Sequence, residues 1–519
     1  MPREHDSAAA RRVPGAGFRH LEASIAQLSG EMAAGRLSSR RLTAAYLARI
    51  RALDEAGPRL RSVIELNPQA LEIASARDRE RRRGEARGPL HGMPILLKDN
   101  IATGDRMATS AGSLALDAIS ATRDSHVAAR LREAGAVILG KTNLSEWANI
   151  RSAHSTSGWS ARGGLTRNPY ALDRNTSGSS SGSAVAIAAN LAVAAVGTET
   201  DGSIVSPSSI NGLVGLKPTV GLVSRDGIIP ISHTQDTAGP MTRSVGDAAL
   251  LLDAIAGADP HDGATADARP ADYAAALQPQ ALRGARLGVV RSQFGRHPGV
   301  DAVIEVALDA LRGAGAVLIE GVELDLGAAE EAELSVLLYE LKAGLPGWLA
   351  EFAPHAPVAT LADVIAWNES HSAEEMPWFG QELFEQAQAL GGLDDRAYLD
   401  ALATCRRTAR DDGIDAALAE HRLDALVAPT GGPAWMTDLV NADNYGGSFS
   451  TPAAVAGYPH ITVPAGFVHG LPVGLSFAGA PWSEAQLIGL AYGFEQATRA
   501  RRAPAFAPSL PSGAGAPGP

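Results

Sequence analysis

Segments with helical spacing are repeatedly followed by short apolar runs in this chain, and this alternation restricts the fold more than any other feature. The pattern occurs at residues 126–140, 302–319 and 414–429. Helices that alternate with short apolar strands indicate a mixed or parallel sheet covered on both faces. We therefore expect an α/β fold with a single large domain, in which a twisted mixed β-sheet is sandwiched between layers of α-helices.

The domain organisation follows from shifts in composition. We expect a polar, disordered leader at residues 1–18, one domain at 19–502, and a disordered tail rich in Pro, Ala and Gly at 503–519. Residues 326–410 interrupt the alternation with a mostly helical stretch that carries aromatic side chains, which is either a substrate lid or a helical layer packed on the sheet. The Ala-rich run 184–196 is too short to span a bilayer and predicts one buried helix.

Composition and charge exclude several classes of function. The formal net charge is −12, so the chain has no basic surplus to neutralise nucleic-acid phosphates. The single cysteine, Cys405, excludes an intramolecular disulfide and a cysteine-rich metal cluster. The N-terminal stretch lacks the apolar segment of a signal peptide. We expect a cytoplasmic monomer without a membrane or nucleic-acid partner.

Two turns of small residues and one lysine have the composition of a catalytic site. SGSSSGS at residues 177–183 reads either as a flexible linker or as an ordered turn whose free N–H groups bind negative charge at a helix N-terminus. GTETDGS at 197–203 could direct several N–H groups at one oxygen, as an oxyanion hole requires. Lys98 follows an apolar run; it is either exposed at a strand end or buried, and a buried lysine can act as a base.

Together these motifs resemble the amidase signature family. That family carries lysine in G-x-P-x-x-x-K-D, a GGSSGGS-like loop, a G-T-D-x-G-G-S turn and G-L-K-P-T. The corresponding stretches here are residues 92–99, 178–183, 197–203 and 215–219. Ser179 and Ser203 are 24 positions apart, as are the two serines of the family. The resemblance implies the amidase signature fold, with its core motifs inside residues 88–250.

The resemblance also implies a mechanism. Ser203 is expected to be the nucleophile, Ser179 is expected to follow a cis peptide bond and to bridge Ser203 to Lys98, and Lys98 is expected to act as the base. The proton would return through Ser179 to the departing ammonia or amine, and water would hydrolyse the acyl-enzyme. The expected oxyanion hole consists of the backbone at Thr200, Asp201, Gly202 and Ser203. No metal or cofactor is implied.

Histidine offers the rival mechanism, a Ser-His-Asp triad. His91, His154 and His233 lie near the motifs in sequence. No G-x-S-x-G elbow presents a serine to them. We therefore interpret them as structural residues or as residues of the substrate pocket.

The substrate class is suggested by a similarity that covers nearly the whole chain. The stretch GTETDGSIVSPSSINGLVGLKPTVGLVSRDGIIPIS is similar to the bacterial peptide amidases of the family, which implies deamidation of C-terminal peptide amides to free acids. Members that amidate transfer RNA carry arginine where this chain has Val205, and Asp201 replaces the usual glycine. Both departures disfavour an anionic substrate.

Residues of the substrate pocket are harder to predict, because each candidate also fits a plain core role. The candidates are Ser180, Asp201, Tyr339, Phe379, Gln381, Trp435 and Tyr458. The side chain of Asp201 could bind a substrate N–H or brace its own turn. Two other functions stay open at this point: a broader amidase of aliphatic, aryl or cyclic amides, and an amidotransferase subunit that depends on a partner.

Overall fold

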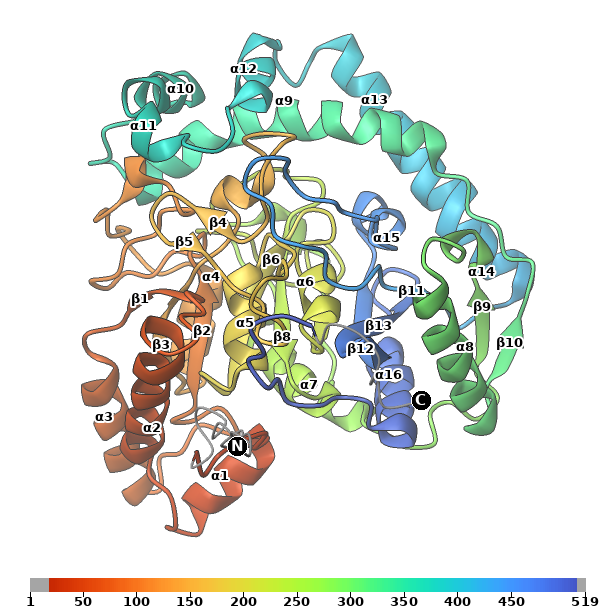
Figure 1. Cartoon of the computed structure of the whole chain (residues 1–519), viewed down its shortest axis with the longest axis horizontal. Helices are drawn as coiled ribbons and strands as arrows, with labels where there is room; N and C mark the ends of the chain where they lie inside the picture. Colours follow the sequence, from red (N-terminus) through yellow and green to blue (C-terminus); the bar gives the residue numbers. More distant parts are fainter. Residues whose placement is uncertain (1–17, 511–519) are drawn as a thin grey trace, which may run out of the picture.

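A mixed sheet of 11 strands forms the centre of the computed structural model, which describes residues 18–510 (Figure 1). Its strands are β1 (Val63–Leu66), β2 (Pro94–Lys98), β3 (Val137–Thr142), β6 (Ala194–Glu199), β7 (Val214–Lys217), β8 (Thr237–Thr242), β9 (Arg286–Val289), β10 (Val317–Ile319), β11 (Ala425–Pro429), β12 (His460–Val468) and β13 (Leu471–Ala478). The strand order is β1-β3-β2-β6-β8-β7-β12-β13-β11-β9-β10. β2 runs parallel to β3 and β6, and β9 runs parallel to β10 and β11. The short strands β4 (Trp159–Ser160) and β5 (Gly164–Leu165) form a separate pair.

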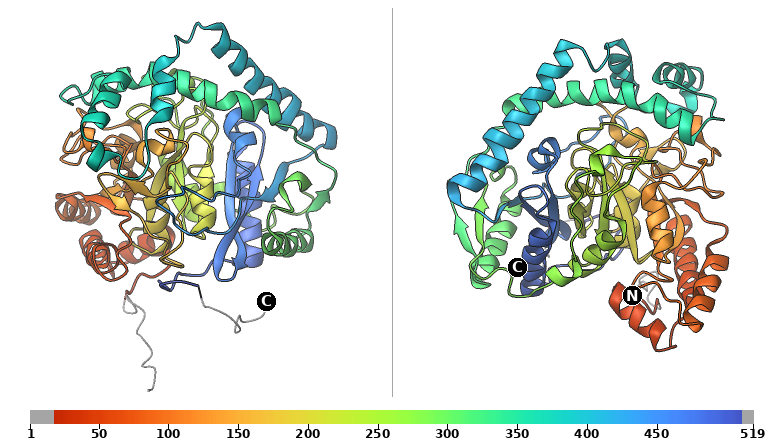
Figure 2. Two further views of the ribbon diagram at one scale, coloured as in Figure 1. Left: turned by 45° about the horizontal axis from the view of Figure 1, so that its top comes forward. Right: turned by 180° about the vertical axis from the view of Figure 1, so that it is seen from behind.

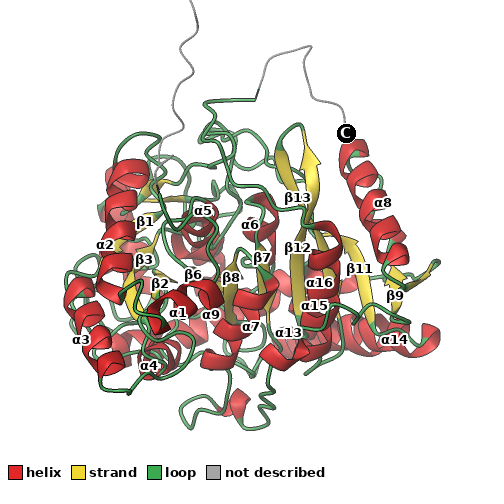
Figure 3. Cartoon of the chain, turned by 90° about the horizontal axis from the view of Figure 1, so that it is seen from below, coloured by secondary structure: helices red, strands yellow, loops and turns green. Residues whose placement is uncertain are grey.

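Helices cover both faces of this sheet (Figure 3). They are α1 (Ile25–Ala33), α2 (Ser39–Ile50), α3 (Ala70–Arg82), α4 (His126–Glu133), α5 (Ser181–Ala188), α6 (Val205–Ile210), α7 (Val245–Ile255), α8 (Pro298–Gly313), α9 (Gly327–Phe352), α10 (Leu361–Ser370), α11 (Ser372–Glu375), α12 (Glu382–Ala389), α13 (Arg396–Arg406), α14 (Ala416–His421), α15 (Thr451–Ala456) and α16 (Glu484–Thr498). α5 and α6 lie on one face, and α4 and α7 lie on the other. The predicted α/β sandwich is thereby confirmed.

The central strands are buried at every position, which explains why their sequences are apolar rather than alternating. Gly197 in β6 shows how closely the layers approach. A Cβ atom at this position would lie 2.8 Å from Ser180 Oγ and 2.6 Å from Met241 Sδ. The absence of a side chain at Gly197 therefore lets the turn before α5 pack directly on β6.

Residues 326–410 form a helical cover, made of α9 to α13, that arches over one end of the sheet (Figures 1 and 2). A fully buried ion pair between Arg151 Nε and Glu146 Oε1, 2.8 Å apart, lies beneath it. Arg151 also donates to the carbonyl oxygens of Phe379 and Gly380, at 3.2 and 3.0 Å. One side chain therefore fastens the cover to the core. Within residues 18–510, no helix has both the length and the hydropathy needed to cross a bilayer.

Two sequence predictions about local structure were wrong. The run 184–196 is not one helix, because α5 ends at Ala188, Asn190 adopts a left-handed φ of 57°, and β6 then begins. Asn190 stabilises this turn, since its Oδ1 accepts a hydrogen bond from Glu22 N at 2.7 Å. The predicted disordered tail does not include residues 503–510, because Phe506 is buried and donates its N–H to Pro169 O. Residues 1–17 and 511–519 lie outside the described part of the chain.

Candidate active site

Lys98, at the end of β2, is fully buried. Its Nζ donates to Ser179 Oγ at 2.7 Å, to Thr198 Oγ1 at 2.9 Å and to Thr198 O at 3.3 Å. Burial lowers the pKa of Lys98 to about 7, although the carboxylates of Asp236 and Glu199 act in the opposite direction. The amine is therefore available in its neutral form near neutral pH.

Ser179 lies in a tight turn before α5. The Gly178–Ser179 peptide bond is cis. Ser179 O accepts a hydrogen bond from Ser145 N at 3.0 Å, and Ser181 Oγ donates to Ser177 O at 2.7 Å. A Cβ atom at Gly178 would lie 2.1 Å from Ser145 Oγ, so only glycine fits there. The serine-rich stretch is thus an ordered turn rather than a flexible linker.

Ser203 lies in the next turn, between β6 and α6, and is buried. Its carbonyl oxygen accepts a hydrogen bond from Ser180 N at 3.2 Å, which joins the two serine turns. Glu199 Oε2 accepts hydrogen bonds from Ile204 N at 2.7 Å and from Val205 N at 3.0 Å. Glu199 therefore fixes the first residues of α6 and, with them, the position of Ser203.

Backbone N–H groups at this turn remain free. Among the described residues, no acceptor takes the N–H groups of Asp201, Gly202 or Ser203. Gly202 has a φ of 76°, and a Cβ atom there would lie 2.9 Å from Ser450 Oγ. A glycine in this conformation lets successive N–H groups face the same space. The turn has the chemistry of an oxyanion hole.

Asp201 connects this turn to α15. Its Oδ2 accepts a hydrogen bond from Thr451 Oγ1 at 2.8 Å, and burial raises the pKa of Asp201. Glu333, on α9, has its pKa raised to about 8 by burial and by the charge of Asp201. Gln235 Nε2 links Glu333 Oε1 at 2.7 Å to the carbonyl oxygen of Thr200 at 3.3 Å. The Thr451 contact is that of a brace, and the carboxyl groups of Asp201 and Glu333 both keep a proton to higher pH than usual.

The remaining predicted pocket residues are placed in two ways. Ser180 Oγ donates to Thr198 O at 3.0 Å, and Trp435 lines a cavity described below. The other side chains contact structural partners. Tyr339 packs on Tyr398, and Phe379 packs on Trp159. Gln381 accepts a hydrogen bond from Asn368, and Tyr458 donates one to Asp415. Among the histidines, His91 bonds Arg77 O, and His233 Nδ1 lies 3.4 Å from a Glu340 oxygen.

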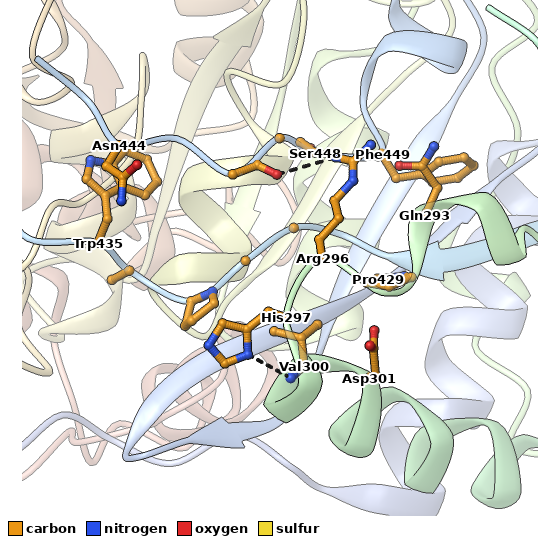
Figure 4. A pocket seen from close by; sticks show the side chains of 16 residues that line it. Gln293, Arg296, His297, Val300, Asp301, Pro429, Trp435, Asn444, Ser448 and Phe449 are labelled. Carbon is orange, nitrogen blue, oxygen red and sulfur yellow. Dashed lines mark hydrogen bonds between the residues drawn. The ribbon is translucent and has the colours of Figure 1, made fainter.

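A cavity of about 290 Å³ lies between the first turn of α8, the end of β11 and residues 444–449 (Figure 4). We call it the α8 cavity. A smaller space, the α6 hollow, lies against α6. Tyr445 lines this hollow but not the α8 cavity. The ring of Tyr445 packs against that of Trp435, with 5.5 Å between the ring centroids. Sequence reasoning missed Tyr445, because the segment around it has neither helical nor strand periodicity.

Comparisons with known proteins find relatives that match nearly the whole chain. The family model described as Amidase matches residues 41–488. A probable amidase from Arabidopsis thaliana is 42% identical over 502 residues, covering 94% of this chain and 92% of that protein. A glutamyl-tRNA(Gln) amidotransferase subunit from Halorhodospira halophila is 36% identical, covering 92% of this chain and 97% of that protein.

Solved structures give a closer match. The native peptide amidase from Stenotrophomonas maltophilia has a TM-score of 0.90 and 58% identity, covering 94% of this chain and 99% of that chain. A peptide amidase in complex with the competitive inhibitor chymostatin has a TM-score of 0.91 and the same identity, with 93% and 99% coverage. From its motifs, its fold and these matches, the chain belongs to the amidase signature family.

Proposed function

We propose that this amidase hydrolyses carboxamide C–N bonds with Ser203 as nucleophile, Ser179 as bridge and Lys98 as general base. One observation carries the proposal. The buried Lys98 amine, whose pKa is lowered to about 7, lies 2.7 Å from Ser179 Oγ, in the turn that is hydrogen-bonded to the Ser203 turn. A neutral lysine in this position can accept a serine proton.

In the proposed reaction, Lys98 first accepts a proton from Ser203 and later donates it to the leaving nitrogen. Lys98 takes the Ser203 proton through Ser179 while Ser203 Oγ bonds to the carbonyl carbon. The resulting oxyanion accepts hydrogen bonds from the free N–H groups of Asp201, Gly202 and Ser203. Lys98 then returns the proton through Ser179 to the leaving nitrogen as the C–N bond breaks. Water hydrolyses the remaining ester.

The proposed substrate is a peptide with a C-terminal amide, converted to free acid and ammonia. The peptide amidases at 58% identity support this choice. A broader amidase is the alternative. A role in an amidotransferase is supported by the relatives at 36% identity, but Val205 argues against it.

Mass spectrometry of a short peptide amide incubated with the purified protein tests this proposal, with a Ser203→Ala variant as control. We expect conversion to the free acid, intact internal peptide bonds and an inert control. If simple amides release ammonia while the peptide amide survives, the proposed amide hydrolysis stands and the proposed peptide substrate is refuted. Equal activity in the Ser203→Ala protein would refute the mechanism.

A further inference from the structure

Asp236 directly precedes β8 and is a buried carboxylate that has no role in the proton transfers proposed above. β6 and β8 run antiparallel with Glu199 opposite Thr237, so the next pair along the two segments is Thr200 and Asp236. Asp236 Oδ1 accepts a hydrogen bond from Thr200 Oγ1 at 2.6 Å. Thr200 precedes the free N–H groups of the turn that ends at Ser203. Asp236 therefore contacts this turn at the point where the chain leaves β6.

The loop that carries Asp236 holds Thr200 by two separate groups. The other carboxylate oxygen, Asp236 Oδ2, accepts hydrogen bonds from Ile231 N and Ser232 N, both at 2.8 Å, so the carboxylate is itself fixed to the backbone of its loop. Gln235 Nε2, from the preceding residue, donates to Thr200 O at 3.3 Å. The hydroxyl and the carbonyl of Thr200 are thus both bound by consecutive residues of one loop.

Lys98 approaches the end of β6 from the same side as Asp236. Its Nζ donates to Thr198 Oγ1 at 2.9 Å, and Thr200 lies two positions further along the chain. Side chains two positions apart in an extended segment point to the same side. Burial lowers the pKa of Lys98, whereas the charge of Asp236 and, to a smaller extent, that of Glu199 raise it. The amine and the carboxylate are therefore close enough to interact.

We propose that Asp236 is a positioning residue for the reaction, whose carboxylate anchors Thr200, and with it the turn of residues 200–203, and places a negative charge near Lys98. The inference rests on the proposed function and adds a residue that acts through Thr200 and Lys98 without contact with the substrate. Donors stabilise an oxyanion best when they are already held in position. A neighbouring negative charge favours the protonated amine, which has to protonate the leaving nitrogen.

The surroundings of Asp236 suit its charged form. The three groups that contact its oxygens, Thr200 Oγ1, Ile231 N and Ser232 N, are all hydrogen-bond donors. Burial raises the pKa of Asp236, whereas these three hydrogen bonds and the charge of Arg225 lower it. A carboxylate that accepts from every neighbour keeps its negative charge more readily than one without donors.

Matched substitutions separate the anchor from the charge. Asp236→Asn removes the charge and preserves the size of the side chain. Thr200→Val removes the hydroxyl that donates to Asp236 and leaves the charge in place, and Thr200→Ser keeps the hydroxyl. Glu340→Gln is the control for the loop, because Glu340 accepts a hydrogen bond from Ser232 Oγ but its charge does not shift the pKa of Lys98.

The experiment measures kcat and kcat/KM against pH with N-acetyl-leucinamide and hexanamide, two uncharged amides of which either one suffices, and records thermal unfolding of each variant. In the unaltered protein, we expect kcat/KM to fall below a midpoint near pH 7. Asp236→Asn should move this midpoint down by about 0.5 pH unit or more, because the protonated amine loses a neighbouring negative charge. Thr200→Val should lower kcat by about tenfold or more without moving the midpoint, and Thr200→Ser should not. Glu340→Gln should leave the midpoint in place.

Two results would overturn the inference while the proposed function stands. One is a midpoint that stays in place in a folded Asp236→Asn protein, or that moves equally in Glu340→Gln. The other is an equal kcat in Thr200→Val and Thr200→Ser, and this comparison decides the matter if Asp236→Asn does not fold. If the unaltered protein hydrolyses neither amide, or if Ser203→Ala remains active, the proposed function is overturned and the role of Asp236 with it.

Discussion

The protonation of Lys98 is governed by burial, and this sets the expected pH dependence of activity. Its pKa is lowered to about 7, so the base is neutral above this pH and charged below it. We predict that kcat/KM falls as pH decreases through about 7, in a pH series with an uncharged amide. Lys98→Arg should lose activity by about 100-fold or more at every pH, because arginine stays protonated.

Lys141 provides the matched control for this prediction. It is also fully buried and its pKa is lowered to about 8, but its Nζ donates to the carbonyl oxygens of Ile101 and Ala108 and to Thr109 Oγ1. Lys141→Met should lower stability while leaving the midpoint of the pH profile in place. A midpoint that follows Lys141 rather than Lys98 would contradict the assignment of the base.

The two serines are expected to act as one unit. We predict that Ser203→Ala abolishes hydrolysis, that Ser179→Ala lowers kcat by about 100-fold or more, and that the double variant is no slower than Ser203→Ala alone. The physical reason is that the proton relay has no function once the nucleophile is missing. Single-turnover kinetics on the three variants test this. Additive losses would show that Ser179 acts independently of Ser203.

At the scale of secondary structure, Glu340 joins α9 to two other parts of the chain. It accepts hydrogen bonds from Tyr398 OH on α13 at 2.7 Å and from Thr234 N at 3.1 Å. We predict that Glu340→Leu lowers the free energy of unfolding by about 2–4 kcal/mol, because several buried donors lose their acceptor. Tyr398→Phe should lower the free energy of unfolding by only about 1 kcal/mol, because it removes a single hydrogen bond. Urea unfolding of both variants measures the difference, and equal costs would refute the shared role.

The elements also show what a sequence can and cannot predict. Lys98, Ser179 and Ser203 could be proposed from the sequence because their motifs are local and chemically unusual, and the structure brings Lys98 Nζ within 2.7 Å of Ser179 Oγ. The helix predicted over residues 184–196 failed because an Ala-rich run does not reveal a turn at Asn190, which depends on a contact with Glu22. Apolar runs predicted β3 and β11 well, since burial on both faces leaves a direct mark on sequence, whereas β6 lay partly inside the run that was expected to be a helix.

The predicted substrate-pocket residues stay predictions, because the same side chains also fit a role in packing. Aromatic side chains in the helical cover, such as Tyr339 and Phe379, pack against structural partners. Tyr445 and Gly446 line the α6 hollow beside Ser206, but they lie in an irregular segment whose position depends on distant contacts. Asp443, for example, accepts hydrogen bonds from Ser157 N at 2.9 Å. A pairing of this kind leaves no periodic signal in the sequence.

Across the whole molecule, Arg151 is paired with Glu146 in the core and donates hydrogen bonds to Phe379 O and Gly380 O of the helical cover. Both side chains are fully buried, and burial raises the pKa of Glu146. We predict that Arg151→Met lowers the free energy of unfolding by about 3–5 kcal/mol, since it leaves a buried carboxylate without its partner. Limited proteolysis should then cut near Gly380, where Arg151 binds the backbone.

A second substitution provides the control. Arg151→Met combined with Glu146→Gln removes the buried charge as well, so it should recover part of the lost stability. Thermal unfolding of the single and double variants measures this. If the double variant is as unstable as the single one, the contacts of Arg151 with the cover, rather than its charge, account for the loss.

The order of the site along the chain has a consequence for how such enzymes diverge. The proposed reacting groups lie between Lys98 and Ser203, whereas the α8 cavity is lined by residues within 293–301 and 429–449. On the proposed mechanism, the reacting groups therefore occupy one stretch of the chain, which ends well before α8 begins. A hybrid that joins the first 255 residues of this chain to the second half of a relative should keep its reaction and acquire the relative's choice of substrate, which would let one reaction serve many substrates by recombination.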